Sequence, residues 1–396
     1  MNSTPAPARI NELISAIKQT AASLSVRPRI MEVCGTHTVA IFRHGLRSLL
    51  EGIVDLISGP GCPVCVTPDV TVDLAVAHAR EGHLVVTYGD MMRVPGTEAS
   101  LLTARAEGAD VRVVTSALAA VDLAAANPDR PVVFLAVGFE TTAPGTGLML
   151  REALARKLDN VCILAAHKLI PPVMRVLLSA KEQVISGFLC PGHVSAVIGL
   201  APYEDISGEF GVPCVVAGFA PDDILLSILM ILRQLREGRA SAEIQYTRVV
   251  KPEGNPAARR LLEEFFTPAD SAWRGLGVMP HSGLALAEAY KRFDAELNLP
   301  VDVPTVKPRT GCRCGEVLRG VLEPSGCPHY GRGCLPETPL GPCMVSSEGT
   351  CGTYYAFGTL PPAPGKVAAG LPVLRAFGLP APRRGGRKVS GSEVIR

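Results

Sequence analysis

Two cysteines separated by two residues, Cys62 and Cys65, carry the strongest chemical signal in the sequence. They follow an apolar run at 53–57, predicted to be a strand, and a Gly-Pro-Gly turn, and they precede a predicted helix from Pro68 to Arg80. The dipole and free N–H groups of a helix N-terminus favour thiolate over thiol, so cysteines placed there are reactive. The spacing also lets the two sulfurs close a disulfide. The motif therefore predicts redox or metal chemistry, with half of a structural zinc site as the alternative.

The composition indicates a well-buried globular protein. The chain has 396 residues, of which 47% are hydrophobic and 19% charged, and a net charge of +2. This length allows two or three domains, and the balanced charge with only 5% aromatic residues argues against nucleic-acid and membrane partners. No apolar run reaches the roughly 18–20 residues of a membrane span, and residues 1–22 lack the apolar centre of a signal peptide. We therefore expect a cytoplasmic protein, in which twelve cysteines need a chemical reason.

From Arg29 onward, short apolar runs alternate with helical patterns. Most of the runs are followed by a Gly-rich or polar turn and then a helix, which is the rhythm of parallel sheets covered on both faces. The predicted strands are 30–33, 53–57, 84–87, 111–114, 132–137, 161–165, 184–189 and 213–217. Further on, 222–235, 255–266 and 283–293 are predicted to be helical, and 244–250 is a candidate strand.

The predicted fold is α/β: two parallel-sheet domains around a cleft, plus a smaller cysteine-rich iron–sulfur domain. The division between the two sheets is placed near Asn127-Pro128. The predicted segments are an N-terminal helix at 1–28 packing on the third domain, α/β domains at 29–126 and 127–236, an iron–sulfur domain at 237–360 and a flexible Pro/Gly/Arg-rich tail at 361–396.

Functional side chains follow the predicted strands, where open parallel sheets bind their ligands. Cys34 and His37 share the loop after the first strand, and a thiolate beside an imidazole suits Fe(II) or another borderline-soft metal. Glu140, His167 and His193 follow strands of the second half. Each of these residues alone is more often structural, but two sheets facing one cleft would bring them together. Cysteines inside strands, at 162 and 214, are interpreted as small buried hydrophobes.

Six cysteines crowd into the C-terminal region, between residues 312 and 351. Four thiolates can hold either zinc or a [4Fe–4S] cluster, and spacing by itself does not choose between them. The two cysteines in excess and the reactive pair elsewhere favour iron–sulfur, because zinc does no redox work. The radical-SAM pattern C-x3-C-x2-C and a phosphate-binding loop are both absent from the sequence. The six are Cys312, Cys314, Cys327, Cys334, Cys343 and Cys351.

Several long motifs together resemble the HypD family of hydrogenase maturation proteins, over about residues 30–355. The motifs are Cys-Gly-Thr-His-Thr at 34–38, Gly-Pro-Gly-Cys-Pro-Val-Cys at 59–65, Gly-Phe-Glu-Thr-Thr-Ala-Pro at 138–144, Pro-Gly-His-Val-Ser at 191–195 and Gly-Pro-Cys-Met-Val-Ser-Ser-Glu-Gly at 341–349. The family's cluster pattern, C-x14-C-x6-C-x16-C, falls on Cys312, Cys327, Cys334 and Cys351. The resemblance implies that Cys314 and Cys343 form a redox-active pair beside the cluster.

The resemblance also implies a function. Proteins of this family work with HypC, here expected in a one-to-one complex, to assemble the Fe(CN)2CO unit of [NiFe]-hydrogenases, and cyanide arrives from HypE as a thiocyanate. Cys34 would bind the nascent iron together with a HypC cysteine, and His37 would assist it. Since detaching cyanide from a thiocyanate is reductive, electrons would pass along a path resembling ferredoxin-thioredoxin reductase, through Cys314/Cys343 to Cys62/Cys65. Glu140, His167 and His193 would then handle protons or anchor the partner.

Two other classes of protein remain as alternatives. A stand-alone iron–sulfur thiol–disulfide oxidoreductase would turn over disulfides without HypC. A structural zinc protein would be colourless, since zinc has no redox chemistry.

Overall fold

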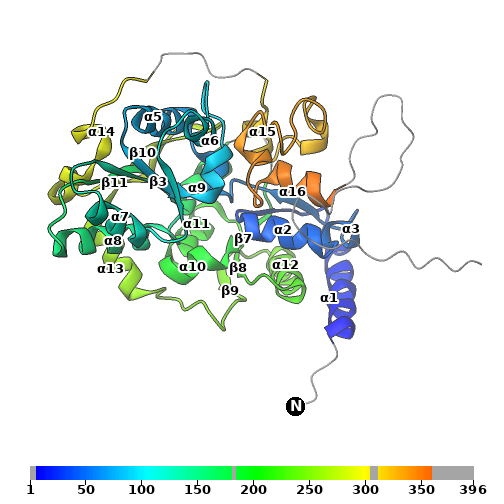
Figure 1. Cartoon of the computed structure of the whole chain (residues 1–396). Coiled ribbons are helices and arrows are strands. Elements are labelled where there is room, and N and C mark those ends of the chain that lie inside the picture. The colour runs from blue at the N-terminus through cyan, green and yellow to red at the C-terminus, as the bar shows by residue number, and fades with distance from the viewer. Residues whose placement is uncertain (1–5, 181–183, 304–310, 359–396) are drawn as a thin grey trace, which may run out of the picture.

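The computed structural model describes residues 6–180, 184–303 and 311–358, and it contains two parallel sheets, one antiparallel hairpin and a cysteine-rich segment (Figure 1). The predicted α/β class with parallel sheets is confirmed. Seven of the eight predicted strands coincide with observed strands to within about two residues, while the run predicted at 184–189 forms its strand slightly later, at Gly187–Pro191. The predicted tail at 361–396 lies outside the described residues.

The first sheet, called sheet A here, has five parallel strands in the order β2-β1-β7-β8-β9. Their bounds are β1 Arg29–Glu32, β2 Asp55–Ser58, β7 Gly187–Pro191, β8 Cys214–Ala217 and β9 Ala242–Ile244. One face of sheet A is covered by α1 Ala6–Ala21, α2 Gly35–Arg43, α3 Leu46–Leu49 and α12 Pro221–Arg236.

The second sheet, sheet B, has four parallel strands in the order β4-β3-β5-β6. Their bounds are β3 Leu84–Tyr88, β4 Val111–Val114, β5 Val132–Gly138 and β6 Val161–His167. The helices of the central part of the chain are α5 Asp69–Arg80, η1 Gly89–Arg93, α6 Leu101–Ala106, α7 Leu118–Ala126, α8 Ala143–Ala155, α9 Ile170–Ser179, α10 Gly192–Ile198 and α11 Ala201–Phe210.

The strands are shared between the sheets differently from the expected split near Asn127-Pro128. The chain forms β1 and β2, leaves sheet A to build all of sheet B, and returns to sheet A at β7, where residues 30–32 pair with 187–189. Period and apolar content mark a buried strand, but they say nothing about which strands pair. The return of β7 to β1 brings the Pro-Gly-His motif at 191–193 to the same sheet edge as Cys34.

The largest apolar cluster joins the two sheets. It combines side chains from sheet A, such as Met31 and Phe188, with side chains from sheet B, such as Leu135 and Leu164, and it also contains Cys65. Two further clusters cover the outer faces of sheets A and B. The cysteine pair is therefore built into the junction of the sheets, where its position depends on both of them.

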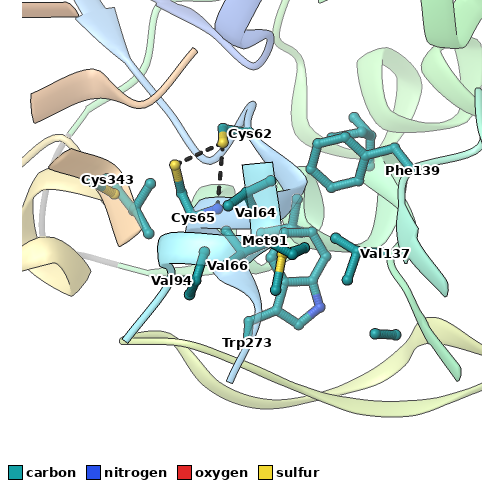
Figure 2. Close-up of a cluster of buried hydrophobic side chains, with 14 of the residues drawn as sticks. Cys62, Val64, Cys65, Val66, Met91, Val94, Val137, Phe139, Trp273 and Cys343 are labelled. Carbon is teal, nitrogen blue, oxygen red and sulfur yellow. Dashed lines mark hydrogen bonds between the residues drawn. The ribbon is translucent and has the colours of Figure 1, made fainter. Parts of the chain in front are cut away.

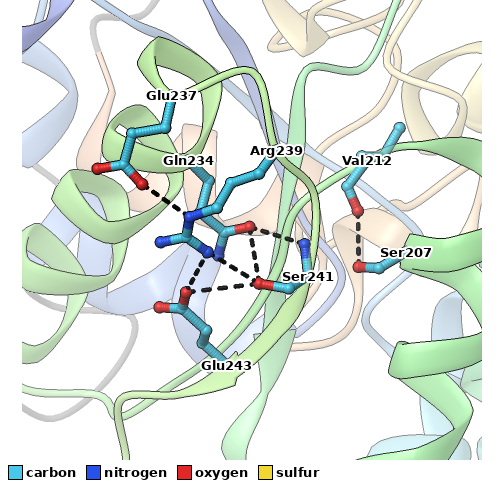
Figure 3. A network of polar contacts seen from close by, with 7 residues as sticks. All are labelled: Ser207, Val212, Gln234, Glu237, Arg239, Ser241 and Glu243. Atoms are coloured by element: carbon cyan, nitrogen blue, oxygen red, sulfur yellow. Dashed lines mark hydrogen bonds and ion pairs between the residues drawn. The ribbon is translucent and has the colours of Figure 1, made fainter.

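Helix α1 is an amphipathic helix, as its sequence predicts, and its apolar side packs against α12 on sheet A. Ile17 is fully buried there with Ile224 and Ile228. This packing differs from the expected contact with the third domain. At the other end of α12, Gln234 accepts a hydrogen bond from the backbone of Ser241 at 2.8 Å, within a polar network that anchors edge strand β9 (Figure 3).

The segment 266–286 forms an antiparallel hairpin that the sequence did not reveal. Its strands are β10 Phe266–Trp273 and β11 Gly277–Leu286, and the helix predicted at 283–293 is wrong over its first half. The run Leu-Ala-Leu-Ala-Glu-Ala has good helix formers, but cross-strand pairing and burial of Leu284 and Leu286 override that preference. The hairpin packs against α9 and β6, and its tip reaches the cysteine-rich segment.

The remaining elements are short helices, of which α13 coincides with the helix predicted at 255–266. They are α4 Pro63–Val66, α13 Pro256–Phe265, η2 Glu288–Phe293, α14 Ala295–Asn298, α15 Cys314–Leu318, η3 Pro324–Gly326, η4 Pro342–Met344 and α16 Thr350–Phe357. Among the helices of the described ranges, none is both long and apolar enough to cross a bilayer.

Replacing Ile17 tests how much the packing of α1 against α12 contributes to stability. Ile17→Ala leaves a cavity between α1 and α12, so we expect the free energy of unfolding to fall by about 2–5 kcal/mol. Val26→Ala is the matched control, because Val26 is 76% exposed and its truncation leaves no cavity. Chemical denaturation of both variants measures the difference, and equal stability would show that α1 does not depend on this contact.

Candidate functional site

Two sulfur-bearing loops meet at the carboxyl edge of sheet A. Cys34 caps the start of α2, directly after β1, and the backbone N–H of Gly35 donates to the carbonyl oxygen of Gly61 at 2.9 Å. A Cβ on Gly61 would lie 2.2 Å from the backbone nitrogen of Cys34, so only glycine allows this approach. Because Gly61 directly precedes Cys62, the expected proximity of Cys34 to the Cys62/Cys65 motif is present in the structure.

Cys34 is buried, with 7% of its surface exposed, and burial raises the pKa of its thiol to about 12. The carboxyl groups of Glu348 and Glu32 raise it further, while the backbone N–H groups of His37 and Thr36 act in the opposite direction. A cation bound to the sulfur would reverse this balance, since coordination deprotonates a thiol outright. The site therefore suits Cys34 to be a metal ligand better than a free nucleophile.

Glu32 supports Cys34 from the end of β1, and sequence reasoning did not find it. One carboxyl oxygen accepts the backbone N–H of Cys34 at 3.2 Å, and the other accepts the Thr38 hydroxyl at 2.5 Å. Burial raises the pKa of Glu32 to about 8. The only signal in the sequence is a carboxylate inside an otherwise apolar strand, which is a position that burial disfavours.

A third segment closes over the same helix start. The Thr36 hydroxyl donates to a carboxyl oxygen of Glu348 at 2.6 Å, and a Cβ on Gly35 would collide with Glu348. Glu348 belongs to the motif at 341–349 but was not assigned a role from sequence. The hydrogen bond with Thr36 shows that this motif does two things. It carries Cys343, and it covers the start of α2 beside Cys34.

His37 and His193 lie on either side of one phenylalanine. The rings of His37 and Phe219 are 4.7 Å apart, and those of His193 and Phe219 are 4.1 Å apart and stacked. Burial lowers the pKa of His37 to about 4, so its ring is neutral, and its Nε2 donates to the carbonyl oxygen of Gly218 at 3.0 Å. His193 is exposed. The two histidines thus connect the buried site to the surface.

Cys62 is the N-cap of the four-residue helix α4 and Cys65 lies within it, and α5 follows with Pro68 as its N-cap. Their sulfur atoms are 2.7 Å apart, and the Cys62 sulfur accepts the backbone N–H of Cys65 at 3.3 Å. This separation is close to the about 2.05 Å of a disulfide. The expectation of an easily ionised pair is wrong for Cys65, because burial raises its pKa well above the usual range.

The cysteines of the C-terminal region continue this pair as a line of thiols. Figure 2 shows Cys343 beside Cys65, and η4, which carries Cys343, packs against α4. Cys314 belongs to the same buried cluster, and its sulfur and that of Cys312 both lie beside Gly341. The two cysteines predicted to form a redox pair are therefore neighbours, and they lie next to the Cys62/Cys65 motif.

The four predicted cluster ligands surround one small cavity of about 20 Å³, which is also lined by Cys314. The backbone N–H of Leu340 donates to the Cys334 sulfur at 3.3 Å, which is the kind of contact that stabilises a cluster thiolate. Burial raises the pKa of Cys351, and the four neighbouring thiols raise it further. Four soft donors of the kind that can hold a [4Fe–4S] cluster are therefore grouped here. In the described ranges no three His, Cys, Asp or Glu side chains are grouped as ligands of a single metal ion.

Glu140 and His167 take their partners from helices α9 and α8 and from the hairpin. A Glu140 oxygen accepts the backbone N–H of Ile170 at 2.9 Å, and burial raises the pKa of this carboxyl to about 7. The His167 ring bonds the Thr146 hydroxyl at 2.9 Å, packs on Phe266 and is 1% exposed. The structure therefore brings His37 and His193 together on Phe219, whereas the printed hydrogen bonds of Glu140 and His167 go to Ile170 and Thr146.

The fold and the site define a class: a parallel α/β protein that gathers thiols from three distant segments at the junction of its sheets. Comparison with known proteins identifies the family to which the chain belongs. A family model described as "HypD: Hydrogenase formation hypA family" matches residues 8–358. The chain belongs to the HypD family of hydrogenase maturation factors.

Curated relatives cover most of the chain. "Hydrogenase maturation factor HypD2" of Bradyrhizobium diazoefficiens is 46% identical over 339 residues, which are 83% of this chain and 89% of the relative. "Hydrogenase maturation factor HypD" of Cupriavidus necator is 45% identical over 354 residues, 87% and 93% of the two chains. The protein of the same name in Escherichia coli strain K12 is 45% identical over 358 residues, 89% and 96%.

Adding one methyl group at Gly61 tests the contact between the two loops. Gly61→Ala forces the Cys62 loop away from Cys34, so we expect a loss of about 1–3 kcal/mol in stability and faster alkylation of Cys34. Gly145→Ala is the control, because a Cβ there meets nothing within 4 Å. Mass spectrometry of alkylated peptides gives the rate, and unchanged protection of Cys34 in Gly61→Ala would contradict the contact.

Glu140 predicts a pH dependence of stability. The folded chain keeps the Glu140 proton up to about pH 7, whereas the ordinary carboxyl value is 4.5. The free energy of unfolding should therefore fall as the pH rises from 4.5 to 7, by on the order of 2–3 kcal/mol from this group. In Glu140→Gln this fall should be smaller, whereas Glu98→Gln, at an exposed site, should keep it. Denaturation curves at several pH values decide between them, and identical profiles would refute the assignment.

Proposed function

We propose that this chain is the scaffold on which, with HypC and HypE, the Fe(CN)2CO unit of [NiFe]-hydrogenase is assembled, and that its thiols deliver the electrons for cyanide transfer. One observation carries the proposal: Cys62, Cys65, Cys343 and Cys314 lie in one buried cluster that reaches the four-cysteine cavity, which Cys314 also lines. Cys34 lies beside the Cys62 end of this cluster, against Gly61.

The thiols can exchange two electrons without moving far. The Cys343 thiolate attacks the Cys65 sulfur of a Cys62–Cys65 disulfide, forming a Cys343–Cys65 bond and releasing the Cys62 thiolate. Attack of Cys314 on Cys343 then closes a Cys314–Cys343 disulfide and releases the Cys65 thiolate. Protonation of both released sulfurs completes the transfer of two electrons and two protons. Cys343 neighbours both Cys65 and Cys314 in the same buried cluster.

Cys312, Cys327, Cys334 and Cys351 would hold the [4Fe–4S] cluster, whose chemistry is one-electron transfer. The chain's own contribution is to exclude water, to place Cys314 beside Cys312, and to donate the Leu340 N–H to Cys334. These contacts hold the exchanging pair at the edge of the cavity. The pair can then be restored after each round of cyanide transfer.

Iron is the substrate of the scaffold, and Cys34 is its proposed ligand on this chain. Soft thiolate donors suit low-spin iron carrying cyanide and carbon monoxide. Since Cys34 is 7% exposed, a cysteine of HypC must complete the site from outside. The exposed His193, stacked through Phe219 onto His37, marks the side on which we place the partner.

Removing the Cys34 sulfur tests the scaffold role. In Cys34→Ala co-purified anaerobically with HypC, we expect the visible absorption that dithionite bleaches to remain and the cyanide and carbon monoxide infrared bands to be lost. Cys162→Ala, which truncates a buried thiol on β6, should keep both signals. Infrared bands of normal intensity in Cys34→Ala would refute the ligand assignment, and a colourless chain with stoichiometric zinc would refute the cluster.

A further inference from the structure

The tip of the β10–β11 hairpin joins the two halves of the thiol line. The backbone N–H of Arg274 donates to the carbonyl oxygen of Val66, the last residue of α4, at 2.9 Å. Its guanidinium reaches Asp69 at the start of α5 at 2.5 Å and the carbonyl oxygen of Pro95 at 3.1 Å. The Arg274 side chain is only 11% exposed, so this is a buried, multiply bonded anchor. It fixes the position of the helix that carries Cys65.

The next residue of the tip contacts the opposite half. A Cβ on Gly275 would lie 2.5 Å from the Cα of Gly315, and a Cβ on Gly315 would lie 2.2 Å from the Gly275 carbonyl oxygen. The backbones of Gly275 and Gly315 are thus in contact, and neither position has room for a side chain. Gly315 follows Cys314 directly on α15, so this contact sets the distance of Cys314 from the hairpin.

The tip itself is held rigidly. Trp273, one residue before Arg274, is 1% exposed, donates its indole N–H to the Ser282 hydroxyl at 2.9 Å and stacks on Phe139 with ring centres 6.0 Å apart. Figure 2 shows Trp273 and Phe139 in the same cluster as Cys62 and Cys65. The hairpin is therefore tied to the core of sheet B while its tip contacts α4 and α15.

We propose that Arg274 and Gly275 are positioning residues that clamp α4 and α15 together, so that the thiols of Cys65, Cys343 and Cys314 stay within exchange distance. The inference rests on the proposed thiol relay, and adds to it a segment that carries no sulfur. Sulfur attack on sulfur needs close and aligned atoms, and a displacement of about 1 Å can cost on the order of 100-fold in rate. The clamp acts only through the cysteines, and it touches no substrate.

Two glycines in the same turn allow a matched comparison. Gly275 and Gly277 both have left-handed backbones, with φ of 74° and 84°, so an alanine is strained to a similar degree at either position. A Cβ on Gly275 strikes Gly315, whereas a Cβ on Gly277 meets nothing within 4 Å. Any difference between Gly275→Ala and Gly277→Ala therefore reports the contact with α15.

The test uses the full chain in a Cys62→Ser/Cys65→Ser background, which leaves Cys314, the residue before Gly315, facing Cys343. The thiol oxidant diamide is added anaerobically, and the rate of the Cys314–Cys343 disulfide is measured by peptide mapping with mass spectrometry. We expect the bond to form equally fast in the background and with Gly277→Ala, and about tenfold or more slowly with Gly275→Ala. Thermal unfolding confirms that the compared chains are folded.

Each outcome has a distinct meaning. Equal rates with Gly275→Ala and Gly277→Ala in folded chains overturn the clamp but leave the relay intact. Failure of the disulfide to form even in the background overturns the relay itself. If Gly275→Ala does not fold, Arg274→Lys decides, because it keeps the charge but loses the two-pronged contact with Asp69 and Pro95 that holds α4. For this variant the Cys65–Cys343 disulfide is followed in a Cys62→Ser/Cys314→Ser background. A rate unchanged by Arg274→Lys then overturns the clamp, and a slower rate supports it.

Discussion

The close contact between Gly61 and the backbone of Cys34 is the constraint on which the site depends. It joins the loop after β1 to the loop after β2, with the Gly35 N–H bonded to the Gly61 carbonyl oxygen at 2.9 Å. A larger residue at position 61 would separate Cys34 from the cysteine pair. Sheet A sets this distance, because β1 and β2 are neighbouring parallel strands whose carboxyl ends lie at one edge.

Burial governs the chemistry of these sulfurs more than helix dipoles do. Cys34 and Cys65 both begin or belong to helices, yet burial raises the pKa of both thiols above their ordinary value. A thiol in this state reacts slowly with small reagents from solution and ionises when a cation or a neighbouring sulfur takes part. The enclosed line of thiols thus favours an internal relay over a stand-alone disulfide oxidoreductase.

Much of the fold and site could be predicted from the sequence, and the failures have physical causes. Apolar runs located the parallel strands, and motif spacing identified Cys34, Cys62 and Cys65, because these signals are local. Pairing of β7 with β1 and the hairpin at 266–286 depend on tertiary contacts that no short window contains. Glu32 and Glu348 were not identified from the sequence, because their importance lies in the residues that they contact in the folded chain. His167 was expected in the cleft, but the unforeseen hairpin covers it.

The most direct test follows electrons into the buried pair. Full-length protein carrying a Cys62–Cys65 disulfide is mixed with reduced ferredoxin, which is too large to reach a pair that is at most 3% exposed. Differential alkylation and mass spectrometry then count the free thiols of Cys62 and Cys65. The account predicts that the unmodified protein and a Cys162→Ser control become reduced, while Cys343→Ser keeps the disulfide. Equal reduction of the pair in Cys343→Ser would contradict the relay on which the account rests.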